Sequence, residues 1–370
     1  MPSTRRVLTE NEARRIVAER CLPATTRHSS IGLELEFLSF TADRGRPSLD
    51  TLESLAATPL PSGGRVTCEP GGQVEASSPP QPTAAEAIAV TAHDVAALRK
   101  RAEAGGVELV AVGADRWRPP QRVVDSCRYR AMEAHFDAIN DAGRQMMCNT
   151  AALQINIDGG HDRWRVAHLI GPAMVAAFAN SPGDDRMRST RVANWLAMEL
   201  GRTRAVTGPL PDAWIDYAFA APALVARNDD DGECIAIPEP APFLEWLNRG
   251  GALGFPTAAD LTYHLTMLFP PVRPRQWIEI RYLDALPSPW WEVATLVVAA
   301  LLDDAVVTET TAAVAGTETL WADAAAHGLD DVRLARAADN CFALALAFTG
   351  DAGVADYLER YVARRVPAWA

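Results

Sequence analysis

Four segments of the sequence alternate apolar and polar residues with a period of two, which is the pattern of β-strands that have two different faces. In the first segment, Leu33 and Leu35 share one face, and Glu34 and Glu36 share the other. In the other three segments the polar face again carries carboxylates and amides, with a single arginine. These polar positions are Gln73 and Glu75, then Gln154 and Asn156, then Glu279 and Arg281. The alternation predicts strands over 31–40, 69–75, 150–158 and 276–283.

Helical patterns occupy much of the remaining sequence. Thr9 and Thr83 each precede a glutamate by three residues, the capping-box signature of a helix start. Helices are expected over 10–20, 84–104, 127–142 and 163–180, and from residue 290 onward. The segment 205–260 is expected to be rich in loops. Because strands and helices interleave without regular βαβ spacing, the pattern favours an α+β fold, and residues 1–370 are expected to form a single domain.

Two interpretations fit the polar faces of these strands. Each strand taken alone fits an antiparallel sheet with one core face and one solvated face. Taken together, the polar faces are almost purely acidic, and carboxylates brought together in one sheet need protons or cations to offset their repulsion. The glutamates concerned are Glu34, Glu36, Glu69, Glu75 and Glu279. An oxygen donor set without clustered cysteine or histidine favours Mg²⁺ or Mn²⁺, which suits phosphoryl transfer from a nucleotide.

The lysine content excludes several classes of enzyme. Lys100 is the only lysine, and the other 34 basic residues are arginines. No glycine-rich loop precedes Lys100, so a Walker A phosphate loop and a protein-kinase site are excluded. Enzymes that need a lysine amine as nucleophile, such as pyridoxal enzymes and Schiff-base aldolases, are disfavoured on the same ground. Any phosphate chemistry must therefore rely on arginine and metal ions.

Charge and cysteine usage indicate the setting of the protein. The formal net charge is −12, which argues against nucleic acid or an anionic membrane as the main partner. The six cysteines are scattered without a CxxC pair, which argues against a disulfide scaffold and suits a reducing compartment. The N-terminal residues show no apolar signal region, and no apolar run approaches the length of a spanning helix. The sequence therefore predicts a soluble cytoplasmic protein that has no membrane partner.

Five blocks of residues, in order along the chain, resemble the glutamate–cysteine ligase family in its plant-type branch, and most closely the actinobacterial ligases of ergothioneine biosynthesis. Two of the blocks, the one that begins at Glu69 and the one that ends at Asp284, are the most specific. The blocks are Gly32–Glu36, Glu69–Glu75, Met146–Asp158, Arg191–Thr203 and His264–Asp284.

The resemblance implies a saddle- or funnel-shaped antiparallel sheet, related to that of glutamine synthetase and flanked by helices. It implies that ATP phosphorylates the γ-carboxylate of L-glutamate, and that the amine of L-cysteine then displaces phosphate to give γ-glutamylcysteine. Mg²⁺ is the implied metal, with Mn²⁺ as an alternative. The sequence gives no oligomeric state.

The resemblance also implies roles for individual residues. The implied metal ligands are Glu34, Glu36, Glu69, Glu75, Gln154 and Glu279. Arg281 and Glu279 are the implied catalytic residues, and Arg281 and Asn156 are expected at the ATP phosphates. Arg191, Trp195 and Arg202 are expected to bind the amino-acid substrates, since guanidinium groups bind carboxylates well. The stretch between Trp195 and Arg202 departs from the plant-type pattern, which has acidic residues there, whereas this chain has Leu196-Ala197-Met198-Glu199-Leu200-Gly201.

Two alternatives stay within the same fold. The first is a carboxylate–amine ligase that keeps the phosphoryl-transfer site and accepts a different amine. The second is a non-catalytic acidic protein that binds a metal or a ligand. The acidic core does not separate the first alternative from a glutamate–cysteine ligase, whereas retention of all five glutamates with Arg281 argues against the second.

Overall fold

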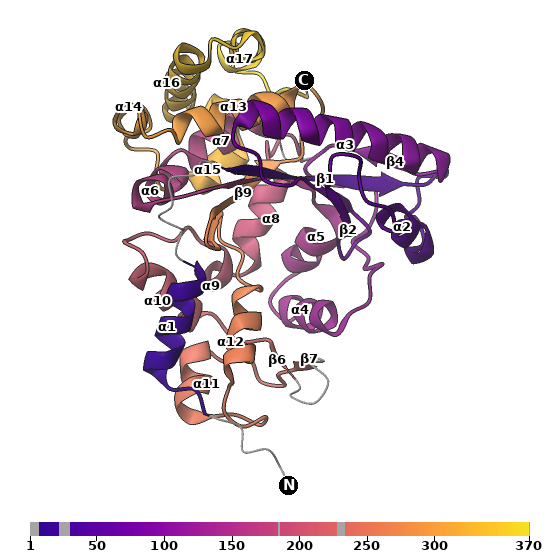
Figure 1. Cartoon of the computed structure of the whole chain (residues 1–370), viewed down its shortest axis with the longest axis vertical. Helices are drawn as coiled ribbons and strands as arrows, with labels where there is room; N and C mark the ends of the chain where they lie inside the picture. The colour runs from indigo at the N-terminus through magenta and orange to yellow at the C-terminus, as the bar shows by residue number, and fades with distance from the viewer. Residues whose placement is uncertain (1–6, 22–29, 184–185, 228–233, 370) are drawn as a thin grey trace.

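The computed structural model describes residues 7–21, 30–183, 186–227 and 234–369, and its centre is an antiparallel β-sheet (Figure 1). The strand order is β2-β3-β1-β5-β9-β8, and β4 pairs with the end of β1. The strands are β1 (Ile31–Phe40), β2 (Arg65–Cys68), β3 (Val74–Ser77), β4 (Glu108–Val110), β5 (Ala152–Ile157), β8 (Val272–Pro274) and β9 (Ile278–Asp284). Every pairing in this sheet is antiparallel, so the predicted α+β class with an antiparallel sheet is confirmed.

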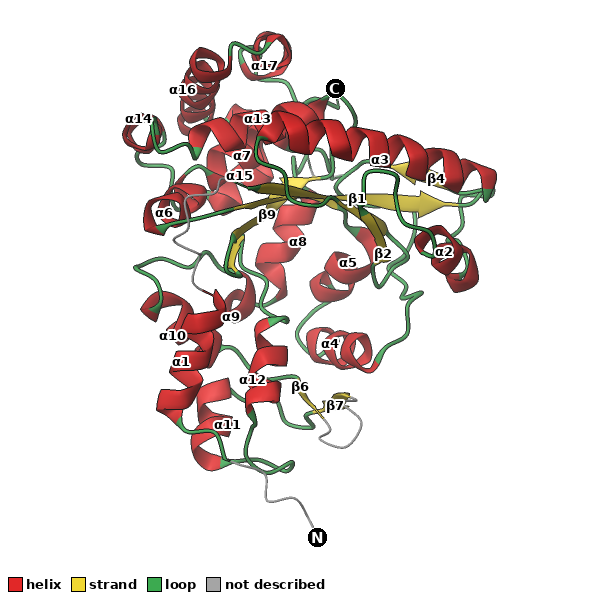
Figure 2. Cartoon of the chain, in the orientation of Figure 1, coloured by secondary structure: helices red, strands yellow, loops and turns green. Residues whose placement is uncertain are grey.

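Helices cover the apolar face of the sheet, which lies uppermost in Figure 2. Leu33, Ile155 and Ile280 are buried beneath them, and burial of such side chains is the main favourable term in folding. The covering helices are α3 (Ala84–Ala104), α6 (His161–Leu169), α7 (Gly171–Phe178), α13 (Trp290–Leu301), α14 (Val307–Ala313), α15 (Trp321–His327), α16 (Val332–Thr349) and α17 (Ala352–Tyr357). Two short turns, η1 (Gly328–Asp330) and η2 (Leu358–Val362), complete this layer.

The opposite, polar face of the sheet looks towards a second group of helices. Those nearest the sheet are α4 (Cys127–Asp137), α5 (Ala142–Asn149) and α8 (Thr190–Met198). Farther from the sheet lie α1 (Glu10–Cys21), α9 (Leu200–Thr203), α10 (Asp212–Ala220), α11 (Phe243–Arg249), α12 (Ala258–Leu265) and the hairpin of β6 (Val225–Arg227) and β7 (Cys234–Ala236). One further helix, α2 (Leu49–Ala56), lies beside β2. Among the described residues no helix is long and apolar enough to cross a membrane.

The strand register brings the predicted polar faces together. Glu34 of β1 lies opposite Gln154 of β5, and Glu36 lies opposite Glu75 of β3. On the far side of β5, Asn156 lies opposite Glu279 of β9. Since paired residues on neighbouring strands point to the same side of a sheet, the polar positions of these four strands share one face.

Four predicted segments differ from the structure. In the strand expected over 69–75, residues 69–73 form the turn between β2 and β3, and β3 begins at Val74. The helix expected over 127–142 is two helices, α4 and α5, and the helix expected over 163–180 is divided between α6 and α7. Pro172 lies in the first turn of α7, where proline is tolerated, and its missing N–H prevents one continuous helix. The segment 205–260, which was expected to be rich in loops, contains α10, α11 and the hairpin of β6 and β7.

A disulfide joins Cys127 at the start of α4 to Cys234 of β7, with their Cα atoms 5.9 Å apart. The sequence did not predict this pair, since the cysteines are scattered along the chain and form no CxxC motif. The two cysteines are 107 positions apart, and only the packing of the β6–β7 hairpin against α4 brings them together. Cys68, Cys148 and Cys341 are free.

Replacing Cys234 with serine is expected to lower the free energy of unfolding of the oxidised protein by about 2–5 kcal/mol, because a long loop is no longer closed in the unfolded chain. Denaturant titration with and without reductant measures the change. Cys68→Ser is the matched control, since Cys68 is a free thiol. Equal stability of oxidised wild type and Cys234→Ser would contradict the prediction.

Candidate active site

A cavity of about 310 Å³ lies against the polar face of the sheet. Its remaining walls come from α4, α5, α8 and the segment that leads into β8. The predicted site residues that line it are Glu34, Glu36, Glu69, Glu75, Gln154, Arg191, Trp195, Glu279 and Arg281. The structure therefore brings together nine residues that are dispersed over some 250 positions of the sequence.

One wall of the cavity is acidic, and its carboxyl groups have raised pKa values. Burial raises the pKa of Glu34 to about 7, and the charges of Glu75 and Glu279 add to the rise. Burial also raises the pKa of Glu36 to about 8, with further contributions from Glu69 and Glu75. For Glu75, burial and then the charge of Glu69 raise the pKa to about 7. These carboxylates repel one another in a buried place, so a cation bound among them would be strongly favoured.

Hydrogen bonds fix the direction of these carboxylates. The backbone N–H of Ala152 and the Nε2 of Gln154 each donate to Glu36, both at 2.8 Å. Asn156 donates from its Nδ2 to Glu34 at 2.9 Å. Both oxygens of Glu36 thus accept a hydrogen bond, and Glu34 accepts one at its Oε1. The acidic wall is thus held by backbone and amide donors of β5.

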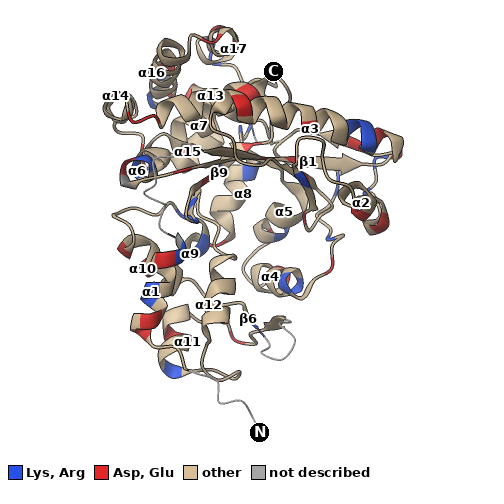
Figure 3. Ribbon diagram, in the orientation of Figure 1, with Lys and Arg blue, Asp and Glu red and all other residues tan. Residues whose placement is uncertain are grey.

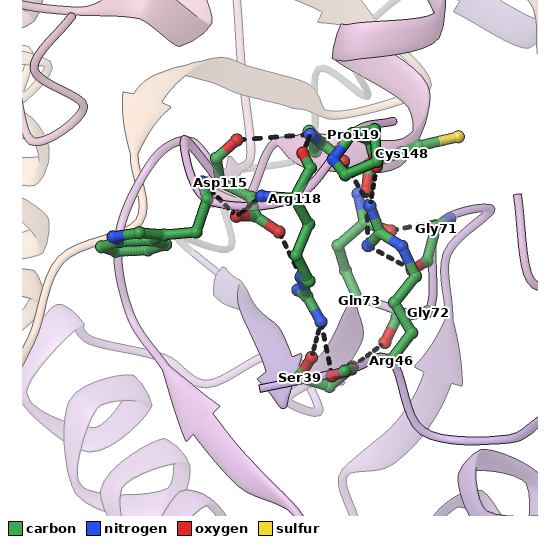
Figure 4. Close-up of polar contacts among 12 residues, drawn as sticks. Ser39, Arg46, Gly71, Gly72, Gln73, Asp115, Arg118, Pro119 and Cys148 are labelled. Atoms are coloured by element: carbon green, nitrogen blue, oxygen red, sulfur yellow. Dashed lines mark hydrogen bonds and ion pairs between the residues drawn. The ribbon is translucent and has the colours of Figure 1, made fainter. Parts of the chain in front are cut away.

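Glu69 lines the cavity at the start of a tight turn between β2 and β3. Figure 4 shows Gly71, Gly72 and Gln73 of this turn with their polar contacts. The carbonyl of Gly71 accepts a hydrogen bond from Arg46, and its N–H donates to the side chain of Gln73 at 2.9 Å. The Nε2 of Gln73 in turn donates to the carbonyl of Thr150 at 2.8 Å. Ser39 donates to the carbonyl of Gly72 at 2.5 Å. The turn is therefore anchored on both sides, which limits the movement of Glu69 and Glu75.

A second part of the cavity lining, the basic wall, is centred on Glu279 and belongs to the same face of the sheet. Arg273 forms a bidentate ion pair with the carboxylate of Glu279, and the Nη1 of Arg281 lies 3.0 Å from its Oε1. Arg275 lies 3.8 Å from the same oxygen. Burial acts to raise the pKa of Glu279, but Arg273 and Arg281 outweigh it and the pKa falls to about 2. Glu279 is thus a permanent anion that holds a cluster of guanidinium groups, unlike the glutamates of the acidic wall.

Three arginines in the cavity wall have buried donors that lack partners. Among the described residues, the Nε atoms of Arg128, Arg191 and Arg281 are buried and donate no hydrogen bond. The ring of Trp195 lies under two of these guanidinium groups, 4.9 Å from Arg191 and 5.5 Å from Arg281. Figure 3 shows basic positions at the start of α8 and around β9, on the cavity side of the sheet. Because unmatched buried donors are unfavourable, these groups indicate sites for anionic ligands.

Asp284, at the end of β9, supports Arg191. Its carboxylate lies 3.8 Å from Arg191 and accepts hydrogen bonds from the backbone N–H of Asn180, from Ser181 and from Ser189. The Nη2 of Arg191 then donates to the carbonyl of Arg281 at 2.7 Å. Asp284 is 2% exposed, so the ion pair is shielded from solvent and keeps Arg191 in place.

Asp284→Asn is expected to lower the free energy of unfolding by about 3 kcal/mol, because it leaves the buried guanidinium of Arg191 without its counter-ion. It is also expected to raise the KM of the carboxylate substrate that Arg191 is predicted to bind. Denaturant titration and steady-state kinetics measure the two effects. Asp162→Asn, an exposed position on α6, is the control. A fully stable Asp284→Asn variant with an unchanged KM would show that Asp284 does not support Arg191.

Two predicted site residues lie outside the cavity wall. Arg202 is fully buried, and its guanidinium group donates to Glu199 and to the carbonyls of Met267 and Pro222. These bonds tie α9 to two neighbouring segments. Arg202 does not line the cavity, so the predicted role of this residue in substrate binding has no support in the structure. Asn156 is likewise occupied, because it donates to Glu34 and accepts from Trp277.

Sequence reasoning missed four residues with ionisable side chains in the cavity wall: Arg128, Tyr129, Arg273 and Arg275. Arg273 and Arg275 lie inside the motif block that ends at Asp284, and their parity with Glu279 was a usable signal. Arg128 and Tyr129 stand at the start of α4, and nothing in the local pattern distinguishes them from surface residues of a helix.

The acidic wall presents the kind of donor atom that a metal ion requires. Its donors are carboxylate and amide oxygens, which suit a hard divalent cation. The pKa values of Glu34, Glu36 and Glu75 are raised, so a bound cation would relieve the repulsion between their charges. In the described parts of the chain, no three acidic, histidine or cysteine side chains converge on one point as metal ligands do. The type of donor fits Mg²⁺, whereas the described side chains are not gathered into a ligand set, so the individual ligands are a prediction.

Comparison with known proteins identifies the family. The pattern of glutamate-cysteine ligase family 2 (GCS2) matches residues 30–356. The glutamate–cysteine ligase EgtA of Mycobacterium tuberculosis is 41% identical over 337 residues, which cover 85% of this chain and 78% of that protein.

Two solved structures share the fold. A glutamate–cysteine ligase of Francisella tularensis, solved in complex with AMP, has a TM-score of 0.51 at 12% identity and covers 92% of this chain and 82% of its own. A bifunctional glutathione synthetase of Pasteurella multocida has a TM-score of 0.54 at 12% identity and covers 96% of this chain, which spans half the length of that protein. These two likenesses concern the fold alone. With a family match over most of its length and 41% identity to a member, the chain belongs to glutamate-cysteine ligase family 2.

Proposed function

We propose that this protein is an ATP-dependent glutamate–cysteine ligase that forms γ-glutamylcysteine, ADP and phosphate. The observation that carries the proposal is a cavity whose lining holds four glutamates together with a cluster of arginines. A carboxylate wall suits the metal ions that accompany a triphosphate, and an arginine cluster suits the charge that develops on a transferring phosphoryl group. Similarity to EgtA supports a role in ergothioneine biosynthesis.

The proposed reaction has two steps. An oxygen of the glutamate γ-carboxylate attacks the γ-phosphorus of ATP, which forms γ-glutamyl phosphate and releases ADP. The amine of cysteine then attacks the acyl carbon, and phosphate leaves with the electron pair of the broken C–O bond as the amine loses a proton. Holding the reactants in one cavity supplies much of the rate enhancement, because it replaces encounters in solution by a fixed geometry.

The role proposed for each arginine follows from its position in the cavity. Arg281, held between Gln154 and Glu279, is the proposed catalytic residue that shares charge with the transferring phosphoryl group. Arg191 and Arg128 are proposed to bind the carboxylates of the two amino acids through their unmatched Nε donors. Glu279 acts through Arg281, because its carboxylate keeps that guanidinium group directed along the basic wall.

Mg²⁺ is proposed to bind at Glu34, Glu36, Glu69 and Glu75, where it would neutralise the charge of the ATP phosphates. In its absence these carboxylates are desolvated and repel one another. We therefore expect Mg²⁺ to raise the melting temperature of the protein, with a larger gain at pH 8 than at pH 6, since protons compete for the same carboxylates. An equal gain at both pH values would argue against these ligands.

The test is ADP release by the purified protein with Mg²⁺, ATP, glutamate and cysteine, each omitted in turn. Release that requires both amino acids, with γ-glutamylcysteine detected by mass spectrometry, is the expected result. Release that requires glutamate and is indifferent to cysteine would keep the acyl-phosphate step and assign a different amine. The absence of release under every condition would overturn the proposal.

A further inference from the structure

Arg46 lies outside the cavity wall, in the segment between β1 and α2, and its side chain reaches the turn between β2 and β3 (Figure 4). Its Nη1 donates to the carbonyl of Gly71 at 3.1 Å and lies 3.5 Å from the carbonyl of Cys148 on α5. Its Nη2 donates to the carbonyl of Pro119 at 2.8 Å and to the Oδ1 of Asn149 at 2.6 Å. One guanidinium group thus joins the turn, the end of α5 and the loop before α4.

The acceptors of Arg46 are themselves held by a second set of hydrogen bonds. The Nδ2 of Asn149 donates to the carbonyl of Asp115 at 3.2 Å and to that of Arg118 at 2.7 Å. The Nε of Arg118 lies 2.6 Å from the carboxylate of Asp115, and its Nη1 donates to the carbonyl of Ser39 at 2.8 Å. Because Asn149 and Asp115 are buried, these bonds are shielded from water and form a fixed frame around Arg46.

The turn between β2 and β3 needs such support because of its charge and its place in the sheet. Glu69 stands before the turn and Glu75 after it, and both carboxylates line the cavity, where like charges repel each other. Among the described strands, β2 pairs with β3 alone, so the sheet holds this hairpin from one side. The tip of the hairpin therefore depends on contacts from outside the sheet. Arg46 supplies one at Gly71, and Ser39 supplies another at Gly72.

The shape of the guanidinium group suits this contact. Its planar fork directs Nη1 to the turn and Nη2 to the opposite side, where Pro119 and Asn149 lie. A lysine ammonium is a point donor on a flexible stem and does not serve both sides with the same geometry. The acceptors of Arg46 are neutral oxygens, and a hydrogen bond from a charged donor is stronger than one between neutral groups.

We propose that Arg46 is a positioning residue for the metal site of the acidic wall. It holds the β2–β3 turn against α5, and this keeps the carboxylates of Glu69 and Glu75 in the wall, where they are available to a divalent cation. The inference rests on the proposed function for the presence of a cation at this wall. Arg46 lies between the first two motif blocks, and the sequence pattern around it did not distinguish it.

The test measures the binding of Mn²⁺ alone, by the electron paramagnetic resonance signal of the free ion. Arg46→Met keeps an unbranched side chain and removes its donors. It is expected to weaken Mn²⁺ binding about tenfold, the equivalent of one lost charge-assisted hydrogen bond, and Arg46→Lys is expected to weaken it less. Removal of a positive charge would by itself favour a cation, so the expected weakening has the opposite sign to a purely electrostatic effect.

Arg44→Met is the matched control, because Arg44 is exposed and pairs with Glu108 at 2.8 Å. It is expected to leave the affinity for Mn²⁺ unchanged. Ser39→Ala removes the bond to Gly72 without a change of charge, and it is expected to weaken Mn²⁺ binding about threefold. If Arg46→Met does not fold, Arg46→Lys and Ser39→Ala decide the question, and wild-type affinity in both would overturn the inference.

Three further results would overturn the inference: wild-type Mn²⁺ affinity in a folded Arg46→Met variant, equal weakening by Arg44→Met and Arg46→Met, or no binding of Mn²⁺ to the wild type. In the first case, a lower melting temperature would show that Arg46 only stabilises the fold. Failure of the proposed function is distinguishable, because it concerns product formation. A wild type that forms no γ-glutamylcysteine and still binds Mn²⁺ in a manner that depends on Arg46 would keep this inference. Normal product formation with unaltered Mn²⁺ affinity in Arg46→Met would remove the inference and keep the function.

Discussion

Glu34→Gln is expected to reduce turnover by about a thousandfold or more, and to raise the melting temperature of the metal-free protein at pH 8. The loss of turnover follows because the variant removes one negative charge from the wall proposed to hold Mg²⁺. The shape of the side chain is kept, and its Oε1 can still accept the hydrogen bond from Asn156. Phosphate or ADP release and differential scanning calorimetry measure the two effects.

The gain in stability follows from the pKa of Glu34. Burial and the neighbouring carboxylates raise this pKa from 4.5 to about 7 in the folded protein. The folded state therefore holds its proton more tightly than the unfolded state, and the wild type loses stability as the pH rises from about 4.5 through 7. Glutamine does not titrate, so the advantage of the variant is expected to be largest at pH 8 and to shrink towards pH 5.

Glu103→Gln provides the matched control, because Glu103 is exposed on α3. It is expected to leave both turnover and the melting temperature unchanged. A Glu34→Gln variant that keeps wild-type turnover would show that Glu34 does not belong to the catalytic wall. A variant that is less stable than the wild type at pH 8 would show that the carboxylates of this wall do not repel one another.

Gly71→Ala is expected to lower the free energy of unfolding by about 3 kcal/mol and to abolish turnover. A Cβ atom at this position would lie 2.0 Å from the carbonyl oxygen of Cys148 and 2.5 Å from its Cα. These are backbone atoms of α5, which cannot move aside as a flexible side chain can, and overpacking of this kind strains the surrounding structure. The added methyl group must displace the turn that positions Glu69. Both the free energy of unfolding and the turnover are therefore expected to fall in the same variant.

The control for Gly71→Ala is the same substitution at Gly160. A Cβ atom there meets nothing within 4 Å, and the backbone conformation is an extended one that alanine adopts readily. Thermal unfolding and ADP release are expected to match the wild type. If Gly71→Ala retained full activity and stability, the close contact between the β2–β3 turn and α5 would not exist in solution.

The strands and their polar faces could be predicted from the sequence because a strand alternates its side chains strictly. Once Glu34 and Glu36 were placed on one face, antiparallel pairing was sufficient to bring Gln154 and Glu75 beside them. The alternation was therefore sufficient to predict which strand residues line the cavity. The family resemblance supplied roles that alternation alone does not contain.

Residues on helices and long-range pairs were harder to predict. Arg128 and Arg202 are both arginines on helices, yet one lines the cavity and the other is buried against backbone carbonyls. Their difference depends on how the helices pack, which local sequence does not determine. The pairing of Cys127 with Cys234 depends in the same way on the approach of the β6–β7 hairpin to α4.

The order of strands in the sheet has a consequence for how the protein is made. β1 pairs with β5, which lies roughly 120 residues later, and β5 pairs with β9 after a similar interval. Such a topology has high contact order, so folding is expected to be slow and the early chain to expose unpaired strand edges. On the ribosome, the nascent chain gains the basic wall only when β9 has emerged. Nucleotide and amino-acid substrates can therefore favour the folded state only near the end of synthesis, and chaperone binding is expected mainly before that point.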